Sequence, residues 1–276
     1  MKKFYTLLSA LSFIASGVSA QTQFVDLGLP SGTLWANMNV GAQSEEEVGT
    51  YVGWGETESK TTYSWATYKW CDGTKNIMTK YVVNEEYGTV DNKTVLDPED
   101  DLATTIAAGA CSPTIEQFNE LLDRNNCTWT AETINDRKGA RVTGQNGNSI
   151  FIPAGGFYSE ARLSSNNSAG CLWTIELKYD PARYYYNANV LRFGISRSGG
   201  ISTDARDHNG MGFVPRNYGY NVRAVKKNSS GIDNVQTSNP EIVKIYNLSG
   251  VELAKPAKGL NIIVYSDGTT EKRMNR

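Results

Sequence analysis

The sequence has 276 residues, with 27 Lys and Arg against 29 Asp and Glu, which gives a formal net charge of −2. A mildly acidic protein has no electrostatic reason to bind nucleic acid or an anionic membrane surface, so neither is expected as a partner. Fifteen Tyr, six Trp and 26 Gly indicate a loop-rich, aromatic-rich β protein rather than a helical bundle.

Residues 1–20 have the layout of a cleavable secretory signal peptide. Lys2 and Lys3 precede an apolar stretch that ends in small residues at Ala20. This stretch is too short to anchor the chain in a membrane, and no second long apolar run follows, so we expect no transmembrane segment. The chain from Gln21 would keep 25 of the 27 basic residues and all 29 acidic residues, a net charge of −4. We therefore expect an exported protein, located outside the cell or on the outer-membrane surface.

The first elements predicted after the signal are short strands and turns. Apolar runs at Phe24–Leu29 and Thr33–Val40 flank Pro30-Ser31-Gly32, which is typical of a turn between two strands. Ser44–Glu47 has the pattern of a capping box and predicts a single helical turn that ends at Gly49. An extended aromatic segment follows.

One clear helix is predicted at about residues 114–124. Thr114 can cap it while Gln117 reaches back to the cap, and Pro113 stands just outside. An apolar face supports the helix, because residues at helical spacing meet on one side of it: Ile115, Phe118, Leu121 and Leu122.

Strands dominate the rest of the chain. Asn146-Gly147 tolerates positive φ and predicts a tight hairpin between two of them. Residues 228–240 are rich in Ser, Asn and Gly and are typical of a linker, and residues 241–276 alternate strands with turns in a compact unit of two hairpins. The fold class expected is therefore α+β, with a small all-β tail. The predicted strands are Thr128–Ile134, Ala140–Gly144, Ser149–Pro153, Leu172–Lys178, Tyr184–Phe193, Tyr220–Val225, Ile242–Asn247, Val251–Ala254, Leu260–Tyr265 and Thr269–Met274.

Four cysteines remain in the exported chain: Cys71, Cys111, Cys127 and Cys171. An oxidising compartment permits two disulfides, with three pairings that the sequence does not separate. The alternative is that some are buried free thiols, which pack like small apolar residues. No CxxC pair or histidine cluster accompanies them, so a zinc site is not expected.

Two groups could carry chemistry through charge. His208 is the only histidine and lies in a turn-like Asp-His-Asn-Gly run, which favours a solvated side chain over a catalytic one. An acidic run can hold calcium together with backbone oxygens, although a solvated acidic loop is the favoured interpretation. The candidate calcium ligands are Asp97, Glu99, Asp100 and Asp101.

Aromatic residues could form a ligand platform. The candidate ligand-binding residues are Trp54, Glu56, Tyr184 and Tyr186, because rings stack on the apolar faces of ligands and a carboxylate accepts hydrogen bonds. The alternative, which we favour for Trp35, Trp54 and Trp173, is that these rings are core residues of a sheet-rich fold. A glycosidase would need two carboxylates across a cleft, and Glu56, Glu58 and Glu176 are available for it.

The segment VDLGLPSGTLWANMNVGA followed by YVGWGE resembles the Fibrobacter succinogenes major paralogous domain, found in exported proteins of the Bacteroidota. The resemblance covers residues 21–227 and continues through YKWCDG, YGTVDNKTVLDPEDD, PTIEQFNELL, NGNSIFIPAGGF and YNVRAV. It implies a C-type-lectin-like fold. Members of the family usually carry a Trp-Arg-x-Pro-Thr run that enters the helix, whereas Ala110-Cys111-Ser112-Pro113-Thr114 stands in its place in this chain. The formylglycine-generating enzymes share the fold at a distance, but their late cysteine pair has no counterpart after Cys171.

The tail at 241–276 resembles the type A sorting domain of the type IX secretion system. The matching pieces are IYNLSG, the Pro-x-Lys-Gly at Pro256–Gly259 and the apolar LNIIV strand, while the last five residues depart from the usual ending. The resemblance implies the type IX machinery as a partner.

We therefore expect an exported, non-catalytic binding or adhesion-type module that recognises a glycan or a surface protein, with no cofactor other than calcium. The alternatives are an extracellular hydrolase acting on polysaccharide and a purely structural component of the surface or of fimbriae.

Overall fold

The structure is a computed structural model that describes residues 21–178, 185–204, 210–228, 242–247, 249–265 and 270–275. The predicted signal peptide, Tyr184, His208 and residues 229–240 of the predicted linker lie outside the described residues. The chain divides into two compact units, Met1–Asn228 and Ser229–Arg276. Within the described ranges, no helix has the length and apolar character needed to cross a membrane.

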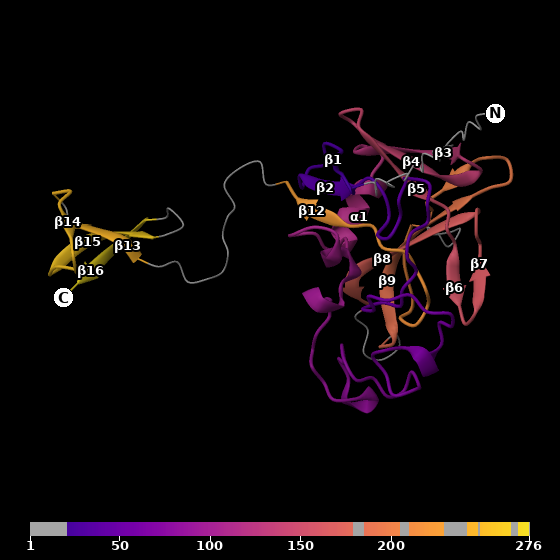
Figure 1. The fold of residues 1–276 in the computed structure, drawn as a ribbon, viewed down its shortest axis with the longest axis horizontal. Helices are drawn as coiled ribbons and strands as arrows, with labels where there is room; N and C mark the ends of the chain where they lie inside the picture. Colours follow the sequence, from indigo (N-terminus) through magenta and orange to yellow (C-terminus); the bar gives the residue numbers. More distant parts are fainter. Residues whose placement is uncertain are drawn as a thin grey trace, which may run out of the picture. The chain divides into compact units, whose positions relative to one another are not determined.

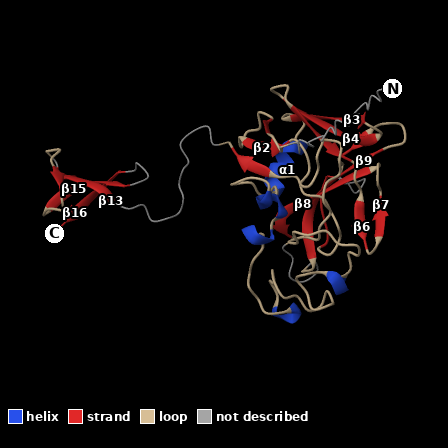
Figure 2. Ribbon diagram, viewed as in Figure 1, coloured by secondary structure: helices blue, strands red, loops and turns tan. Residues whose placement is uncertain are grey.

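The described part of the first unit is rich in strands and has one α-helix, so its fold is α+β and mostly β (Figures 1 and 2). Several small antiparallel sheets replace a single large one. The strands are β1 (Phe24–Asp26), β2 (Thr33–Ala36), β3 (Cys127–Ile134), β4 (Arg137–Gly144), β5 (Ser149–Pro153), β6 (Phe157–Ser159), β7 (Arg162–Ser164), β8 (Ala169–Leu177), β9 (Asn187–Ile195), β10 (Ile201–Ser202), β11 (Gly210–Pro215) and β12 (Val225–Lys227).

The two ends of the first unit meet in one sheet. Its order is β1-β2-β12, with Trp35 of β2 facing Val25 on one side and Val225 on the other. The turn predicted before β2 is confirmed, since the Gly32 N–H donates to the Leu29 carbonyl at 2.9 Å. Gly32 has φ +68°, which glycine adopts without steric cost.

Strand β9 is the centre of the largest sheet in the first unit. It pairs with β8, β10 and β11, while β3, β4 and β5 form a separate meander. The predicted Asn146-Gly147 hairpin joins β4 to β5, with Gly147 at φ +84°. Where Tyr184–Phe193 was predicted as one strand, β9 begins only at Asn187, because Tyr185 and Tyr186 form a turn.

Helix α1 (Ile115–Leu122) confirms the predicted helix and its capping box. The Thr114 hydroxyl accepts from the Gln117 N–H at 3.2 Å, and the Gln117 side chain accepts from the Thr114 N–H at 2.9 Å. Phe118 and Leu121 are buried, as their shared face predicts. The helix ends two residues earlier than expected, because the chain turns out of it at Asp123, and Thr114 is its cap rather than its first residue.

The core contains the three tryptophans that the sequence favoured as core residues. Trp35 is fully buried and Trp54 and Trp173 are each 1 % exposed. Arg223 is also buried, and its guanidinium donates to the Asn39 side chain and to the Ala36 and Phe151 carbonyls at 2.8–2.9 Å. One side chain thus ties three distant segments together.

The segment between β2 and α1 contains no strand of its own. It is drawn in indigo to purple in Figure 1 and is held by isolated bridges and short 3₁₀ turns. The helical turn predicted at Ser44–Glu47 is a hydrogen-bonded turn instead, since the Glu47 carboxylate accepts from the Gln43 N–H at 2.8 Å. The 3₁₀ turns are η1 (Trp65–Thr67), η2 (Glu85–Tyr87), η3 (Pro98–Asp100) and η4 (Leu102–Thr105).

The second unit is a four-stranded antiparallel sheet of order β14-β13-β15-β16. Ile245 and Ile263 face each other across β13 and β15 and are its buried apolar side chains among the described residues. The predicted strands of the tail agree with the structure to within two residues at each end. They are β13 (Ile242–Asn247), β14 (Glu252–Leu253), β15 (Gly259–Tyr265) and β16 (Thr270–Asn275).

The four cysteines are free thiols, so the disulfides that the sequence left open do not form in this structure. Cys127 and Cys171 are buried in two different apolar clusters, and the Cys71 thiol donates to the Trp65 carbonyl at 3.1 Å. Burial raises the pKa of both Cys127 and Cys171 to about 11. These thiols therefore pack as apolar side chains.

Candidate functional site

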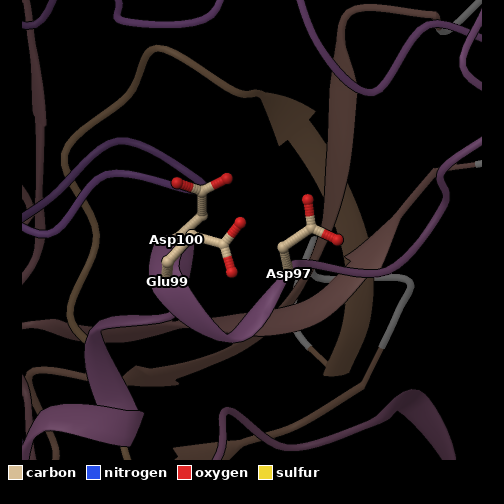
Figure 3. A group of neighbouring side chains, drawn as sticks. All are labelled: Asp97, Glu99 and Asp100. Atoms are coloured by element: carbon tan, nitrogen blue, oxygen red, sulfur yellow. The ribbon is translucent and has the colours of Figure 1, made fainter.

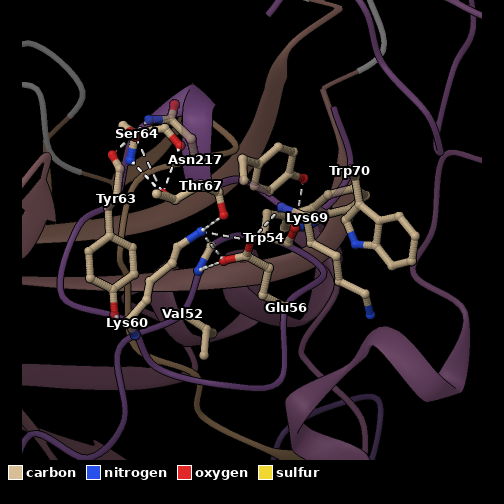
Figure 4. Close-up of polar contacts among 12 residues, drawn as sticks. Val52, Trp54, Glu56, Lys60, Tyr63, Ser64, Thr67, Lys69, Trp70 and Asn217 are labelled. Atoms are coloured by element: carbon tan, nitrogen blue, oxygen red, sulfur yellow. Dashed lines mark hydrogen bonds and ion pairs between the residues drawn. The ribbon is translucent and has the colours of Figure 1, made fainter. Parts of the chain in front are cut away.

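Glu56 is placed by the loop that follows Trp54, and its carboxylate is already fully used inside the protein. It accepts from the Lys60 ammonium at 2.7–2.8 Å and from the backbone N–H groups of Gly53 and Lys69 at 3.1 and 2.8 Å. Figure 4 shows the Lys60 ammonium directed at this carboxylate. Glu56 is 6 % exposed, and its edge lines a pocket of about 360 Å³ with Glu58 and Lys69. Glu56 therefore holds the loop in place, because its carboxylate oxygens are hydrogen-bonded to groups of the protein itself.

Trp54 does not belong to a ligand platform, contrary to the candidate role given to it. Its indole N–H donates to the Thr174 carbonyl at 2.9 Å, and its ring meets the Tyr81 ring edge-on at 4.9 Å. A side chain that is 1 % exposed cannot stack on a ligand. Its neighbours in the core, including Tyr81 and Leu96, explain why the ring is buried.

Tyr186 does lie in an aromatic group, which we call the aromatic ladder: Trp65, Tyr186, Tyr185 and Tyr87. Trp65 meets Tyr186 edge-on with centroids 5.9 Å apart, and Tyr186 meets Tyr185 edge-on at 5.0 Å. Tyr185 then stacks on Tyr87 with an interplanar angle of 6°. Trp65, Tyr186 and Tyr87 are half-buried, so parts of three rings remain accessible. Edge-on and stacked contacts of this kind hold rings in fixed orientations.

Polar groups border the aromatic ladder. The Lys75 ammonium lies 4.9 Å from the centre of the Tyr186 ring, at cation–π distance, and the side chain is exposed. The Tyr185 hydroxyl donates to the Asn76 side-chain oxygen at 3.1 Å. Burial raises the pKa of Tyr185 to about 12, so the phenol is a neutral hydrogen-bonding group at physiological pH. The ladder thus combines apolar ring faces with a cation and an amide.

The residues after Tyr186 and at the end of β11 form a buried polar layer next to the ladder. Asn187 pairs with Pro215, and the Arg216 guanidinium donates to the Tyr185 carbonyl at 2.7 Å. Within the described residues, the Asn187 and Asn217 side-chain oxygens and the Arg216 Nε have no hydrogen-bond partner. Buried polar atoms without partners cost free energy, and native proteins concentrate such features at functional sites.

The acidic run gathers as a cluster, but a lysine lies inside it. One oxygen each of Asp97, Glu99 and Asp100 lies within 4.8 Å of the others, and Figure 3 shows these three side chains on one turn. The Lys80 ammonium is 2.5 Å from Asp97, 2.6 Å from Asp100 and 3.8 Å from Glu99. An ammonium at the centre supplies the positive charge that calcium would supply, so the residues do not fit a calcium ion while Lys80 stays there.

Hydrogen bonds from Lys80 and Lys93 hold the pKa of Asp97 below its usual range. Burial alone would raise the pKa of Asp100, but hydrogen bonds from Lys80, Tyr81 and Lys69 outweigh it and lower the pKa. Both carboxylates are therefore charged partners of lysine at neutral pH.

Asp101 points away from this cluster. Its carboxylate accepts from the Ser112 N–H and hydroxyl, both at 2.6 Å, and from the Ala103 N–H at 3.0 Å. Burial raises the pKa of Asp101 against the effect of these hydrogen bonds. Asp101 therefore caps η4 and holds Ser112 in the approach to α1, and it is not a fourth cation ligand.

The carboxylates considered for glycoside hydrolysis have structural partners as well. Glu176 accepts from the Ile115 N–H at 2.5 Å, at the beginning of α1, and burial raises its pKa. Glu56 is held by Lys60, and Glu58 lies at the rim of the same pocket. Glu176 is therefore placed at the beginning of α1, apart from the residues that line the pocket of Glu56 and Glu58.

Comparison with known protein families, with characterised proteins and with solved structures gave no match to this chain. Sequence reasoning found Tyr186, and it missed Tyr87 and Lys75. Tyr186 lies in a turn and not in the strand predicted there, and the stacking of Tyr87 on Tyr185 depends on a long-range packing that no local pattern encodes.

Proposed function

We propose that this chain is an exported, non-catalytic binding or adhesion-type module that recognises a glycan or a surface protein with the aromatic ladder. The observation that carries the proposal is the ladder itself: three partly exposed rings, fixed by ring contacts and bordered by Lys75, next to a layer of buried polar groups. Recognition sites are typically loops held on a rigid scaffold, and the ladder comes from η1, η2 and the turn before β9.

Ring faces suit either class of ligand. The apolar face of a sugar ring stacks on an indole or a phenol, and protein interfaces favour Trp and Tyr for the same combination of apolar area and polar tip. A surface of this kind binds without a reaction, and the engagement of Glu56 and Glu176 in structural hydrogen bonds supports a binding role over hydrolysis.

We include the fold family of the first unit and the role of the tail in the same proposal. The α+β fold with one helix and a closing sheet of first and last strands supports a C-type-lectin-like architecture of the Fibrobacter succinogenes major paralogous domain type. The separate four-stranded sheet at the end of the chain supports a sorting domain read by the type IX machinery, which would deliver the protein to the cell surface or the medium.

A glycan and mucin array tests the binding function. The protein from Gln21 to Arg276 is applied with and without calcium, beside the Trp65→Ala and Tyr186→Ala variants. Each variant should lose at least about fivefold in affinity, because one stacking ring is worth on the order of 1 kcal/mol or more. Tyr246→Ala is the matched control, since this half-buried tyrosine lies in the other compact unit.

Equal binding by the Tyr186 variant and the control would refute the role of the ladder. Turnover in a parallel polysaccharide hydrolysis screen that disappears with Glu56→Gln would overturn the binding function in favour of an enzyme. Delivery is tested separately by deleting residues 241–276 in a native host. Normal surface display of the truncated protein would refute the sorting role.

A further inference from the structure

A second hollow lies away from the aromatic ladder. It has a volume of about 650 Å³ and lies where the end of α1, the beginning of β3 and the strand β10 meet. Volumes of this size are typical of small-molecule sites. Of the predicted ligand residues that the structure describes, none lines it, and neither does the ladder.

Trp129 of β3 gives this pocket a fixed aromatic wall. Its indole N–H donates to the Leu121 carbonyl at 2.6 Å, at the end of α1, and its ring packs at 62° against Phe193 with centroids 5.7 Å apart. The side chain is half-buried, so it is held from one side and lines the pocket with the other. A ring oriented in advance costs little conformational entropy when a ligand stacks on it.

Apart from Leu122 and Ile201, the other described residues of the wall are polar and balanced in charge. Arg124 and Asp204 contribute one charge of each sign, and Thr128, Ser202 and Thr203 contribute hydroxyls. Arg124 is exposed, and among the described residues it has no hydrogen bond or ion pair. Its five N–H donors are therefore available to a ligand. A wall with no net charge favours a neutral ligand that has many hydroxyl groups.

A neighbouring hollow of about 330 Å³ extends the pocket along the β9–β10 hairpin. The two hollows share Ile201 and Ser202, and the second adds Ser168 and Ser196. Among the residues that the structure describes, no lysine, arginine, aspartate or glutamate lines this extension. The extension therefore adds serine hydroxyls and the apolar side chain of Ile195 to the surface that a longer ligand could contact.

We propose that this groove binds a neutral oligosaccharide, with one sugar ring stacked on Trp129 and its hydroxyls bound by Arg124, Asp204 and the Ser and Thr hydroxyls. A sugar ring presents an apolar C–H face and a rim of hydroxyls, which match an aromatic wall with polar neighbours. A peptide adding as a strand fits less well, because β10 has only two residues and offers too short an edge for a ladder of backbone hydrogen bonds.

The test uses isothermal titration of the protein from Gln21 to Arg276 with neutral gluco-, xylo- and manno-oligosaccharides. An uronic-acid oligosaccharide and an unrelated extended peptide are the comparison ligands. Arg124→Ala and Thr128→Ala alter exposed side chains and leave the core untouched. Arg162→Ala is the matched control, since Arg162 is an exposed arginine without a hydrogen bond or ion pair among the described residues.

A neutral oligosaccharide should bind, with affinity lowered at least about fivefold in Arg124→Ala and changed less than twofold in Arg162→Ala. Trp129→Ala should abolish binding, with circular dichroism reporting whether this variant stays folded. The Trp65→Ala/Tyr186→Ala double variant should bind the oligosaccharide normally, which separates this groove from the aromatic ladder. No binding by any neutral oligosaccharide, tighter binding of the uronic-acid ligand or of the peptide, or equal affinity in the two arginine variants would each overturn the proposal.

Discussion

Replacing Lys80 by Met should destabilise the first unit more than removing any exposed lysine of the same cluster. The Lys80 ammonium contacts Asp97 at 2.5 Å and Asp100 at 2.6 Å, and the Asp100 side chain is only 2 % exposed. Breaking a buried ion pair from one side costs about 3–5 kcal/mol, because it leaves a buried charge without a partner.

The cost at Lys80 should fall somewhat below that range. Asp100 keeps hydrogen bonds from the Tyr81 hydroxyl at 2.7 Å and from the Lys69 ammonium at 3.3 Å. We therefore expect a loss of about 2–3 kcal/mol in the free energy of unfolding. For a unit of this size, that loss corresponds to a Tm lower by roughly 7 °C.

Urea unfolding followed by tryptophan fluorescence measures this loss, and Lys93→Met is the matched control. Lys93 contacts Asp97 at 2.6 Å, but its side chain is 45 % exposed, so its removal should cost less than about 1 kcal/mol. Calcium gives a second readout, since it should raise the Tm of the Lys80→Met protein and leave that of the parent unchanged. Equal destabilisation by the two substitutions, or a parent protein whose Tm rises with calcium, would refute the assignment of Lys80 as the internal cation.

Three further outcomes are expected. Lysine contacts hold the folded pKa of Asp97 and Asp100 low, so the stabilisation by these carboxylates is complete above their unfolded pKa of about 4 and is lost as the pH falls through the folded pKa. Urea unfolding between about pH 6 and pH 3 should therefore show a smaller loss of unfolding free energy for Lys80→Met than for the parent. Mass spectrometry without reductant should find four thiols, with Cys127 and Cys171 alkylated only after unfolding, and a protected disulfide would contradict the structure. Arg223→Lys should cost more than about 2 kcal/mol, because an ammonium cannot reproduce three directed hydrogen bonds, and a Tm within 2 °C of the parent would contradict this.

Local patterns predicted the elements whose geometry depends on neighbouring residues. The capping box of Thr114 and Gln117 defines the beginning of α1, and the Asn146-Gly147 pair defines a hairpin, because both depend on backbone groups within a few positions. The strands of the tail were equally predictable, since turn residues separate alternating apolar runs there.

Local patterns did not predict the contacts between residues that lie far apart in the sequence. Lys80 enters the acidic cluster from seventeen positions before Asp97, and nothing near either residue indicates that they meet. The burial of Trp54 depends in the same way on Tyr81, and the stacking of Tyr87 on Tyr185 depends on two loops that are far apart in the sequence. The contacts and charges of the candidate site therefore follow only from the three-dimensional structure.

The meeting of β1, β2 and β12 has a consequence for how the protein is made. Trp35 of β2 pairs with Val225, and the Ala36 carbonyl accepts a hydrogen bond from the Arg223 guanidinium. Residues at the end of the unit therefore complete the sheet that β1 and β2 begin. Closing so long a loop is slow, because most of the intervening chain is ordered when it closes. The β1-β2-β12 sheet is therefore complete only once Val225 has been synthesised.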